Sequence, residues 1–177
     1  MRKILLAVVL FTSFAMNAQF WIGGSLGLEF VKPDYEGSKT ITTFSFAPEL
    51  GFAGNEKVDF VLALNESLIN YDGTTANSIS VEPYIRYTFA KAGIVSFFID
   101  GGFGVGYTEF SDYDFLEESQ IRFHIGFRPG IKLSLTEKFG LSAKLGFVGY
   151  EKIVSSYDAF GFNLNNNSLS FGAYYSF

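Results

Sequence analysis

The sequence contains one histidine, His124, in a segment where charged residues recur at alternate positions. A histidine beside a serine can activate it as a nucleophile, but no serine neighbours His124 convincingly. We therefore interpret His124 as part of a polar network on one face of a sheet. The expected members of this network are Glu29, Glu49, Asp59, Glu82, Arg86, Asp100, Arg122, His124, Arg128, Lys132 and Lys144.

Apart from the histidine, this set contains five acids and five bases. A solvated surface needs no such balance, whereas an enclosed space does, because a buried charge without a partner is costly. Strand pairing places Asp100 opposite Arg128 or Gly130, so we predict a salt bridge between Asp100 and Arg128. A bulge or an asymmetric loop that shifts the register is the alternative. The charges are expected to cross-link opposite walls and to leave no wide channel.

A second group of charged residues lies in the acidic and aromatic segment 109–118. Its carboxylates could bind Ca²⁺ or take part in divalent bridges to lipopolysaccharide, but the segment lacks the glycine and the residue order of a calcium loop. We interpret it as a solvated loop whose aromatic residues suit contact with a partner protein. The four acids in question are Asp112, Asp114, Glu117 and Glu118.

Two further kinds of chemistry are excluded by residue type and context. The glycines between 101 and 106 lie inside an alternating strand that no helix follows, so they do not form a phosphate-binding loop. Glycine at these positions makes room for side chains from across the sheet. The chain has no cysteine, which excludes disulfides, thiolate metal sites and cysteine nucleophiles. We expect no cofactor and no metal.

The elements that position these residues are predicted from alternation with period two, which is typical of β-strands. In each segment one face is rich in large apolar residues and the other is small or polar. Most are close to the ~9–11 residues with which a tilted strand crosses a bilayer. The eight segments are 20–30, 43–52, 58–65, 79–89, 95–108, 121–133, 139–148 and 169–177.

Short and long connections alternate between these segments. Short turns are expected at 54–56, 91–92 and 136–138, and longer polar loops at 32–40, 70–77, 109–120 and 151–167. Outer-membrane barrels have tight periplasmic turns and long extracellular loops. The pattern therefore predicts an all-β fold, an eight-stranded antiparallel up-and-down transmembrane β-barrel with both chain ends in the periplasm.

The main alternative is a soluble β-sandwich or lipocalin-like barrel with the apolar face inside. The chain has 22 phenylalanines and 10 tyrosines, and large aromatics recur on the apolar face of nearly every strand. That volume exceeds what the interior of an eight-stranded barrel can hold. In a membrane barrel these side chains face lipid instead.

The N-terminus has the organisation of a secretory signal peptide. A basic start precedes an apolar run from Ile4 to Phe14, which is shorter than the ~20 residues of a membrane-spanning helix, so an uncleaved anchor is the weaker interpretation. Cleavage is expected after Ala18, with Ala15 as the alternative. Residues 1–18 are thus the predicted signal peptide and residues 19–177 the barrel domain.

The overall charge bears on the class of partner. The chain has 13 basic and 18 acidic residues, for a net charge of −5. A nucleic-acid-binding protein needs a basic face to displace counterions from phosphates. We therefore expect no nucleic-acid partner.

The whole mature chain resembles the small outer-membrane β-barrels of the OmpA-transmembrane-domain and OmpX type, often described as porin-family proteins. The most specific feature is the last strand, one face of which ends in an aromatic residue. It is similar to the signal that the barrel-assembly machinery recognises in this family. Its residues are Leu169, Phe171, Ala173, Tyr175 and Phe177.

The resemblance implies a Gram-negative outer-membrane location, with lipid, lipopolysaccharide and the barrel-assembly machinery as partners. The family hosts many functions on one fold. Because the sequence stops at Phe177, without the periplasmic domain of full-length OmpA, we do not expect a wall tether. Three functions remain open: a non-enzymatic structural and surface-interaction barrel, which we favour, a narrow pore for small solutes, and an enzyme acting on lipid A or phospholipid.

Overall fold

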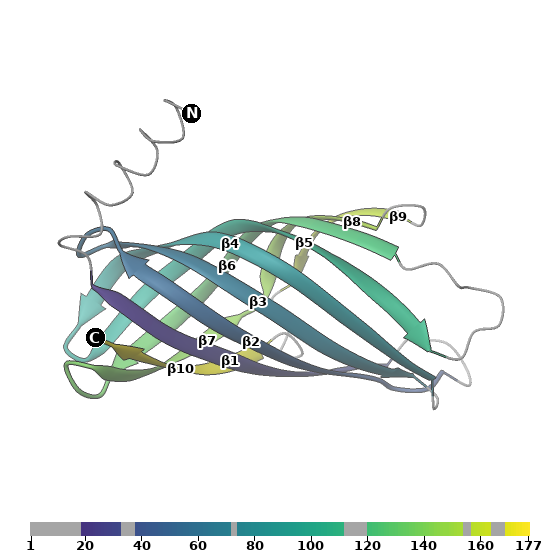
Figure 1. The fold of residues 1–177 in the computed structure, drawn as a ribbon, viewed down its shortest axis with the longest axis horizontal. Helices are drawn as coiled ribbons and strands as arrows, with labels where there is room; N and C mark the ends of the chain where they lie inside the picture. The colour runs from purple at the N-terminus through teal and green to yellow at the C-terminus, as the bar shows by residue number, and fades with distance from the viewer. Residues whose placement is uncertain (1–18, 33–37, 72–73, 112–119, 154–156, 164–168) are drawn as a thin grey trace, which may run out of the picture.

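In the computed structural model the described residues are 19–32, 38–71, 74–111, 120–153, 157–163 and 169–177. They form ten strand segments (Figure 1). None of the described residues belongs to a helix that could cross a membrane. The segments are β1 (Phe20–Val31), β2 (Ile41–Ala53), β3 (Val58–Tyr71), β4 (Thr74–Ala92), β5 (Val95–Ser111), β6 (Gln120–Ser134), β7 (Phe139–Leu145), β8 (Phe147–Ile153), β9 (Tyr157–Asn163) and β10 (Leu169–Ser176).

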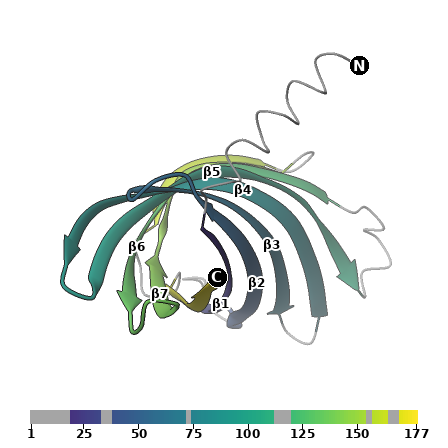
Figure 2. The same cartoon turned by 60° about the vertical axis from the view of Figure 1, so that its left-hand side comes forward.

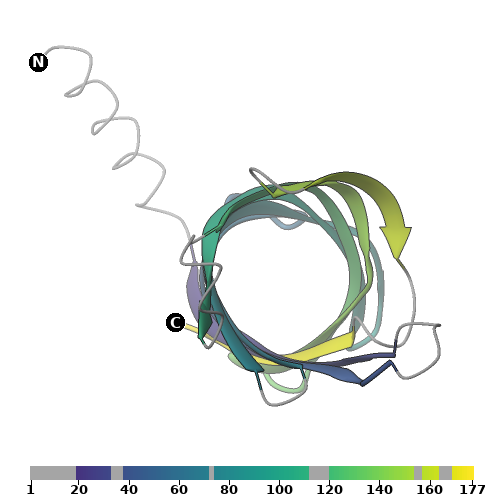
Figure 3. The ribbon, with the colours of Figure 1, turned by 90° about the vertical axis from the view of Figure 1, so that its right-hand side faces the viewer.

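The segments close into one antiparallel barrel with an eight-stranded wall, as the sequence predicts. Neighbours along the wall run from β5 back through β4, β3, β2 and β1 to β10, then to β7 and β6, and the pairing of β5 with β6 closes the ring. Segments β7 and β8 form one wall strand, and β9 and β10 lie along the next. Figure 3, viewed along the axis, shows the closed ring.

The connections differ from the prediction at several strand ends. β3 continues to Tyr71 and β4 begins at Thr74, so most of the loop expected at 70–77 is paired strand. The loop expected at 151–167 likewise contains the end of β8 and all of β9. The turn expected at 91–92 lies instead at Gly93 and Ile94, where Gly93 has a φ of 60°. The end of β3 and the start of β4 are polar and lack the apolar alternation by which strands are recognised, so the sequence pattern assigns them to a loop, whereas Figure 2 shows β3 and β4 as long continuous strands.

The register fixes the tilt of the strands. Partners of Leu26 traced through β2, β3 and β4 lead to Tyr107 on β5. Traced the other way, through β10, β7 and β6, they lead to Phe97, ten residues away on the same strand. This stagger over eight strands corresponds to a tilt of roughly 40°. Leu26 lies four strands from β5 in either direction, so it marks the middle height of the wall between Phe97 and Tyr107.

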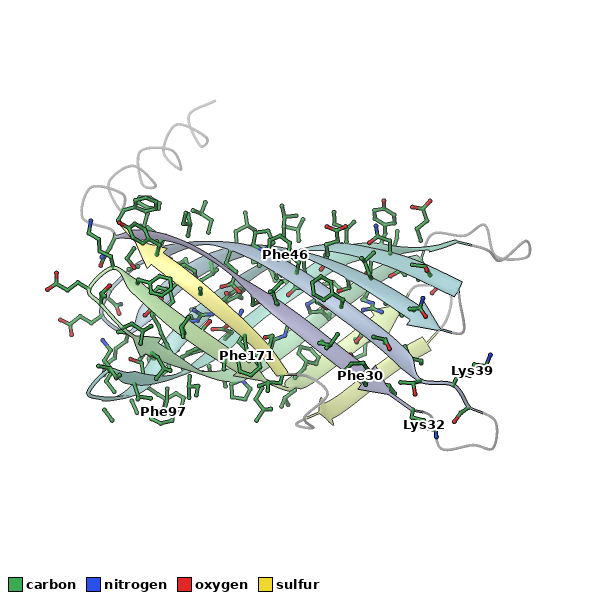
Figure 4. All side chains as sticks on the ribbon, turned by 90° about the horizontal axis from the view of Figure 1, so that it is seen from below. Phe30, Lys32, Lys39, Phe46, Phe97 and Phe171 are labelled. Atoms are coloured by element: carbon green, nitrogen blue, oxygen red, sulfur yellow. The ribbon has the colours of Figure 1, made fainter. Side chains whose placement is uncertain are left out.

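The apolar face of the wall points outward on every strand, as expected for a barrel in lipid. Phe30, Phe46, Phe97 and Phe171 project from the outside in Figure 4, and Phe171 is 62% exposed. Between Phe97 and Tyr107 this band is about 25 Å tall, which matches the apolar belt of an outer-membrane barrel. The charged face is thereby enclosed in the lumen.

Candidate functional site in the charged lumen

Just below middle height, a cluster of four charged residues crosses the lumen. Arg86 on β4 donates two hydrogen bonds to Asp100 on β5, at 2.8 Å from Nε and 2.9 Å from Nη2. Lys144 on β7 donates to Glu49 on β2 and lies 3.5 Å from Asp100. Arg86 Nη2 is also 3.9 Å from Glu49, which closes the cluster. Two acids and two bases from four strands therefore neutralise one another across the barrel.

Tyr84 completes this central cluster as a hydrogen-bond acceptor. Its hydroxyl oxygen accepts from Arg86 Nη2 at 3.2 Å and from Lys144 Nζ at 3.3 Å. Arg86 is 2% exposed and is among the largest fully buried side chains of the described residues. A buried cation is stable only when its donors are satisfied, and here carboxylates and a phenol satisfy them.

An aromatic layer lies beneath the cluster, toward the short turns. The guanidinium of Arg86 stacks over Phe98 at 4.1 Å and over Trp21 at 5.5 Å, and Trp21 packs edge-on against Tyr174 at 6.3 Å. Glycines opposite these rings provide the room, as the sequence predicts. A Cβ at Gly51 would lie 1.9 Å from the Trp21 indole. The aromatic layer fills the lumen below the charges.

The predicted salt bridge between Asp100 and Arg128 is wrong, although the register is right. Asp100 and Arg128 are strand partners, but Asp100 also faces Arg86 on the other side and takes the bidentate bond from it. Arg128 instead donates to Glu82 at 2.8 Å. Pairing on one edge of a strand does not decide between two cations that flank the same carboxylate.

Glu82 collects four polar partners around middle height. Besides Arg128, it accepts hydrogen bonds from Ser80 at 2.9 Å and Asn65 at 3.2 Å, and His124 Nε2 lies 3.6 Å away. His124 is thus part of the lumen network, as interpreted from the sequence. The hydroxyl of Ser80 donates its hydrogen bond to Glu82 and not to His124. Ser80 and His124 therefore both contact the same carboxylate and do not form a serine–histidine pair.

A β-bulge at Gly146 exchanges the inner and outer faces of the wall strand that β7 and β8 form. Gly130 pairs with Lys144 and Phe127 with Val148, so β7 and β8 contain one more residue than β6 over this stretch. Gly146 has a φ of 68°, which an L side chain rarely adopts. The inner and outer faces exchange after it, so the period-two alternation predicted for segment 139–148, which would place Phe147 on the lipid face and Val148 on the lumen face, is wrong beyond Gly146.

The side chain of Phe147 consequently lies inside the barrel. It meets His124 edge-on at 5.9 Å and lies beneath the Arg128 guanidinium at 5.5 Å. A Cβ at Gly126 or Gly149 would clash with its ring. Beyond the bulge Glu151 also points inward and forms an ion pair with Arg122 at 3.2 Å.

The upper lumen, toward the longer connections, contains a cavity of about 230 Å³. Glu29 lines it, and no cation of the described residues lies within ion-pair distance of that carboxylate. Arg128, whose side chain is 33% exposed, lines it too. The remaining members of the predicted network lie at the opposite end, where Lys132 stacks over Tyr174 at 3.9 Å and Asp59 pairs in register with Arg86.

Sequence reasoning missed the lumen roles of Trp21, Tyr84, Phe98, Phe147 and Glu151. Tyr84 and Phe98 share the inner parity of their charged neighbours and are identifiable by that signal. Trp21 does too, opposite Gly51. Phe147 and Glu151 follow the bulge, so the alternation assigns the first to the wrong face and the polar sequence assigns the second to a loop.

The predicted assembly signal lies on β10, which pairs with β1 and β7, and ends at Phe177 directly after that strand. Phe171, Tyr175 and Phe177 are exposed on the lipid face, whereas Leu169 lines the cavity. The acidic residues considered for Ca²⁺ lie at 112–118, outside the described residues. Within the described part of the chain, no three His, Asp or Glu side chains are grouped to hold a metal ion.

An antiparallel wall, an apolar outer belt and an ionic lumen define an integral outer-membrane barrel. A family model described as outer membrane protein beta-barrel domain matches residues 4–177, and the chain belongs to this family. The chain is therefore located in the outer membrane, like the other members of this family. No curated protein sequence matches the chain.

Solved structures share the fold at low sequence identity. The N-terminal barrel of Pseudomonas aeruginosa OprF is 14% identical with a TM-score of 0.58, over 89% of this chain and 97% of that one. Neisserial surface protein A is 13% identical with a TM-score of 0.53, over 90% and 96%. Ail of Yersinia pestis, in complex with the heparin analogue sucrose octasulfate, is 16% identical with a TM-score of 0.52, over 90% and 97%.

Proposed function

We propose that this protein is a non-enzymatic structural and surface-interaction barrel whose lumen does not conduct. The observation that carries the proposal is the central cluster of Glu49, Arg86, Asp100 and Lys144, which joins opposite walls. The aromatic layer beneath it occupies the remaining section. An ion that passed through would have to break several charge-assisted hydrogen bonds, and such bonds are costly to leave unmade.

Planar-bilayer recording tests this proposal. The unaltered protein is expected to give no stable openings. The double variant Arg86→Ala with Lys144→Ala removes both cations and is expected to open a water path with cation preference, because Glu49 and Asp100 remain. Glu29→Gln, in the cavity above, is the matched control and should leave the membrane silent.

Stable openings in the unaltered protein would show that it is a narrow pore, the alternative function. Openings of the same size in the unaltered protein and the double variant would also show that the central cluster does not block the path. Heat-modifiable migration on a denaturing gel identifies folded barrels. A lack of channel openings that is caused by misfolded protein can therefore be recognised.

The outer surface and the strand ends support the interaction role. Exposed aromatic residues anchor the barrel in lipid, and β3, β4 and β5 extend beyond the apolar band and present polar edges outside. The proposed partners are outer-membrane lipid, lipopolysaccharide and an extracellular protein. Phe171 and Tyr175 on β10, with Phe177 directly after that strand, are proposed to be recognised by the barrel-assembly machinery after removal of a signal peptide that ends at Ala18 or Ala15.

The absence of catalysis is part of the proposal and has its own test. His124 is the one histidine of the chain, and it contacts Glu82 and Phe147. Overexpression is expected to leave the lipid A profile and the free fatty acids of the cell unchanged. A change in either that disappears in His124→Asn would identify an enzyme.

A further inference from the structure

One residue interrupts the apolar pattern of the outer wall. Glu66 on β3 is exposed and has the same outward parity as Leu64 and Leu68, which are exposed on the lipid face. Among the described residues, Glu66 is the only charged side chain on the lipid face of the apolar band between Phe97 and Tyr107. An ionisable side chain at such a position is costly, and it most often marks a functional site.

The register places Glu66 at the depth of the outer leaflet. Glu66 lies opposite Phe46 on β2, and Phe46 lies opposite Leu26, which marks middle height. Glu66 is thus two of eight register steps from Leu26, in the direction of Tyr107. Since eight steps correspond to the ~25 Å of the band, Glu66 lies about 6 Å above the middle. The longer connections are on this side, which is the extracellular side of outer-membrane barrels.

The surroundings of Glu66 on the wall are apolar. Its strand partners Phe46 and Ile79 are exposed on the same face, and Figure 4 shows Phe46 projecting outward. Leu64 and Leu68 precede and follow it along β3. No side chain of the described residues forms a hydrogen bond or an ion pair with the Glu66 carboxylate. The barrel itself therefore leaves this carboxylate without a polar partner.

The chemistry of a carboxylate decides which lipid group suits this position. An ionised carboxylate accepts hydrogen bonds and donates none, so its partner must supply N–H or O–H groups near the upper end of the acyl chains. Ester-linked glycerophospholipids have only carbonyl acceptors at that level. Lipid A has amide-linked and 3-hydroxylated acyl chains, which provide both kinds of donor there. Its phosphates lie closer to the water, and a carboxylate repels them.

We propose that Glu66 binds lipid A in the outer leaflet by accepting hydrogen bonds from the amide N–H and hydroxyl groups at the upper end of its acyl chains. The inference rests on the proposed role of lipopolysaccharide as a partner and assigns it a position on the wall, at β3. The contact compensates for the loss of water around the carboxylate. It distinguishes lipids by the donors of their acyl linkages and not by the charge of their headgroups.

Urea unfolding in two kinds of vesicle tests the need for donors. Phosphatidylcholine and sphingomyelin have the same headgroup, but only sphingomyelin has an amide N–H and a hydroxyl where its chains begin. Glu66→Leu should raise the urea midpoint in phosphatidylcholine, because it removes a carboxylate from the apolar band. In sphingomyelin it should raise the midpoint less or lower it, because hydrogen bonds to the lipid are lost. Equal shifts in the two vesicles would overturn the proposal.

Glu109→Leu is the matched control for this measurement. Glu109 is exposed on the outer face of β5, two residues beyond Tyr107, and therefore lies above the apolar band. The same substitution there should shift the midpoint equally in the two vesicles. A lipid dependence at Glu109 as large as that at Glu66 would show that the effect is not specific to the carboxylate within the band, and the proposal would be wrong.

Native mass spectrometry of the full protein released from detergent tests lipid A itself. Glu66→Leu should weaken lipid A binding about tenfold, and Glu66→Gln should weaken it less, because the amide keeps a carbonyl acceptor. Heat-modifiable migration shows that each variant is folded. Unchanged binding in Glu66→Leu would overturn this site while leaving lipopolysaccharide as a partner. Absence of lipid A from the unaltered protein as well would overturn both the site and the partner, and the non-conducting lumen would stand on its own recordings.

Discussion

The two halves of the lumen are built from the same alternating pattern and are packed differently. In the lower half, Arg86, Asp100 and Trp21 fill the section, and their partners are buried. In the upper half, the ion pair of Arg122 with Glu151 has both side chains about one-third exposed, and a cavity remains. The period-two alternation therefore predicts which residues face the lumen, but it does not predict how completely their side chains fill it.

Side-chain volume and one backbone irregularity account for the difference. Below middle height, large aromatic residues stand opposite glycines, as Trp21 does with Gly51. Above it, the cavity is lined by the small residues Gly27, Ser45 and Ala47, and after the bulge at Gly146 the partner of this wall strand changes from β10 to β9. The lower half is therefore expected to be the more rigid of the two.

The largest expected effect is loss of the central cation. Arg86→Met keeps much of the volume but leaves Asp100 and Glu49 with Lys144 alone. Removing one partner of a buried ion pair costs about 3–5 kcal/mol because the remaining charge is uncompensated. Urea unfolding of the protein in lipid vesicles measures this loss. An effect below that of Arg122→Gln in the upper half would contradict the distinction between the halves.

A smaller effect is expected from filling a glycine position in each half. Gly51→Ala forces the Trp21 ring to move, since the new Cβ would lie 1.9 Å from it, and overpacking costs about 1–3 kcal/mol. Gly27→Ala meets Ser45 at an ordinary 3.5 Å and should be neutral or stabilising, because glycine weakens a strand. The same unfolding measurement on both variants compares the packing of the two halves directly.

The fold and the lumen network follow from the sequence where the alternation is uninterrupted. Glu49, Glu82, Arg86 and Lys144 are all inward, as period two predicts. Which charges pair is not predictable in this way, because Asp100 has a cation on each neighbouring strand and side-chain reach decides between them.

The inward turn of Phe147 depends on a single glycine in the left-handed region. Nothing distinguishes Gly146 in the sequence from the glycines that only provide space, such as Gly104. Its φ of 68° is set by the pairing of β8 with β6, which forms between residues distant in the chain. The local sequence pattern therefore predicts the strands of the wall but not the bulge at Gly146 that interrupts one of them.

Substitution of Gly146 tests whether that interruption is built into the backbone. Gly146→Ala should cost about 1–2 kcal/mol, the penalty of an L side chain at positive φ. Gly146→Asn should cost less, because asparagine tolerates this region. Equal stability of all three proteins in urea would show that the bulge is not required, and the upper half would then be able to pair like the lower one.

The smallest expected effect is at the upper ion pair. Arg122→Gln should cost about 0.2–1 kcal/mol, since partly exposed pairs gain little over hydration. A double-mutant cycle with Glu151→Gln isolates the coupling between Arg122 and Glu151, and 1 M salt should remove it, because the Debye length falls to about 3 Å. The loss caused by Arg86→Met should be nearly unchanged by the same salt, because the central cluster is shielded from the solution. A salt-resistant coupling at Arg122 would mean that the upper half is as enclosed as the lower one, which would contradict the distinction between the two halves.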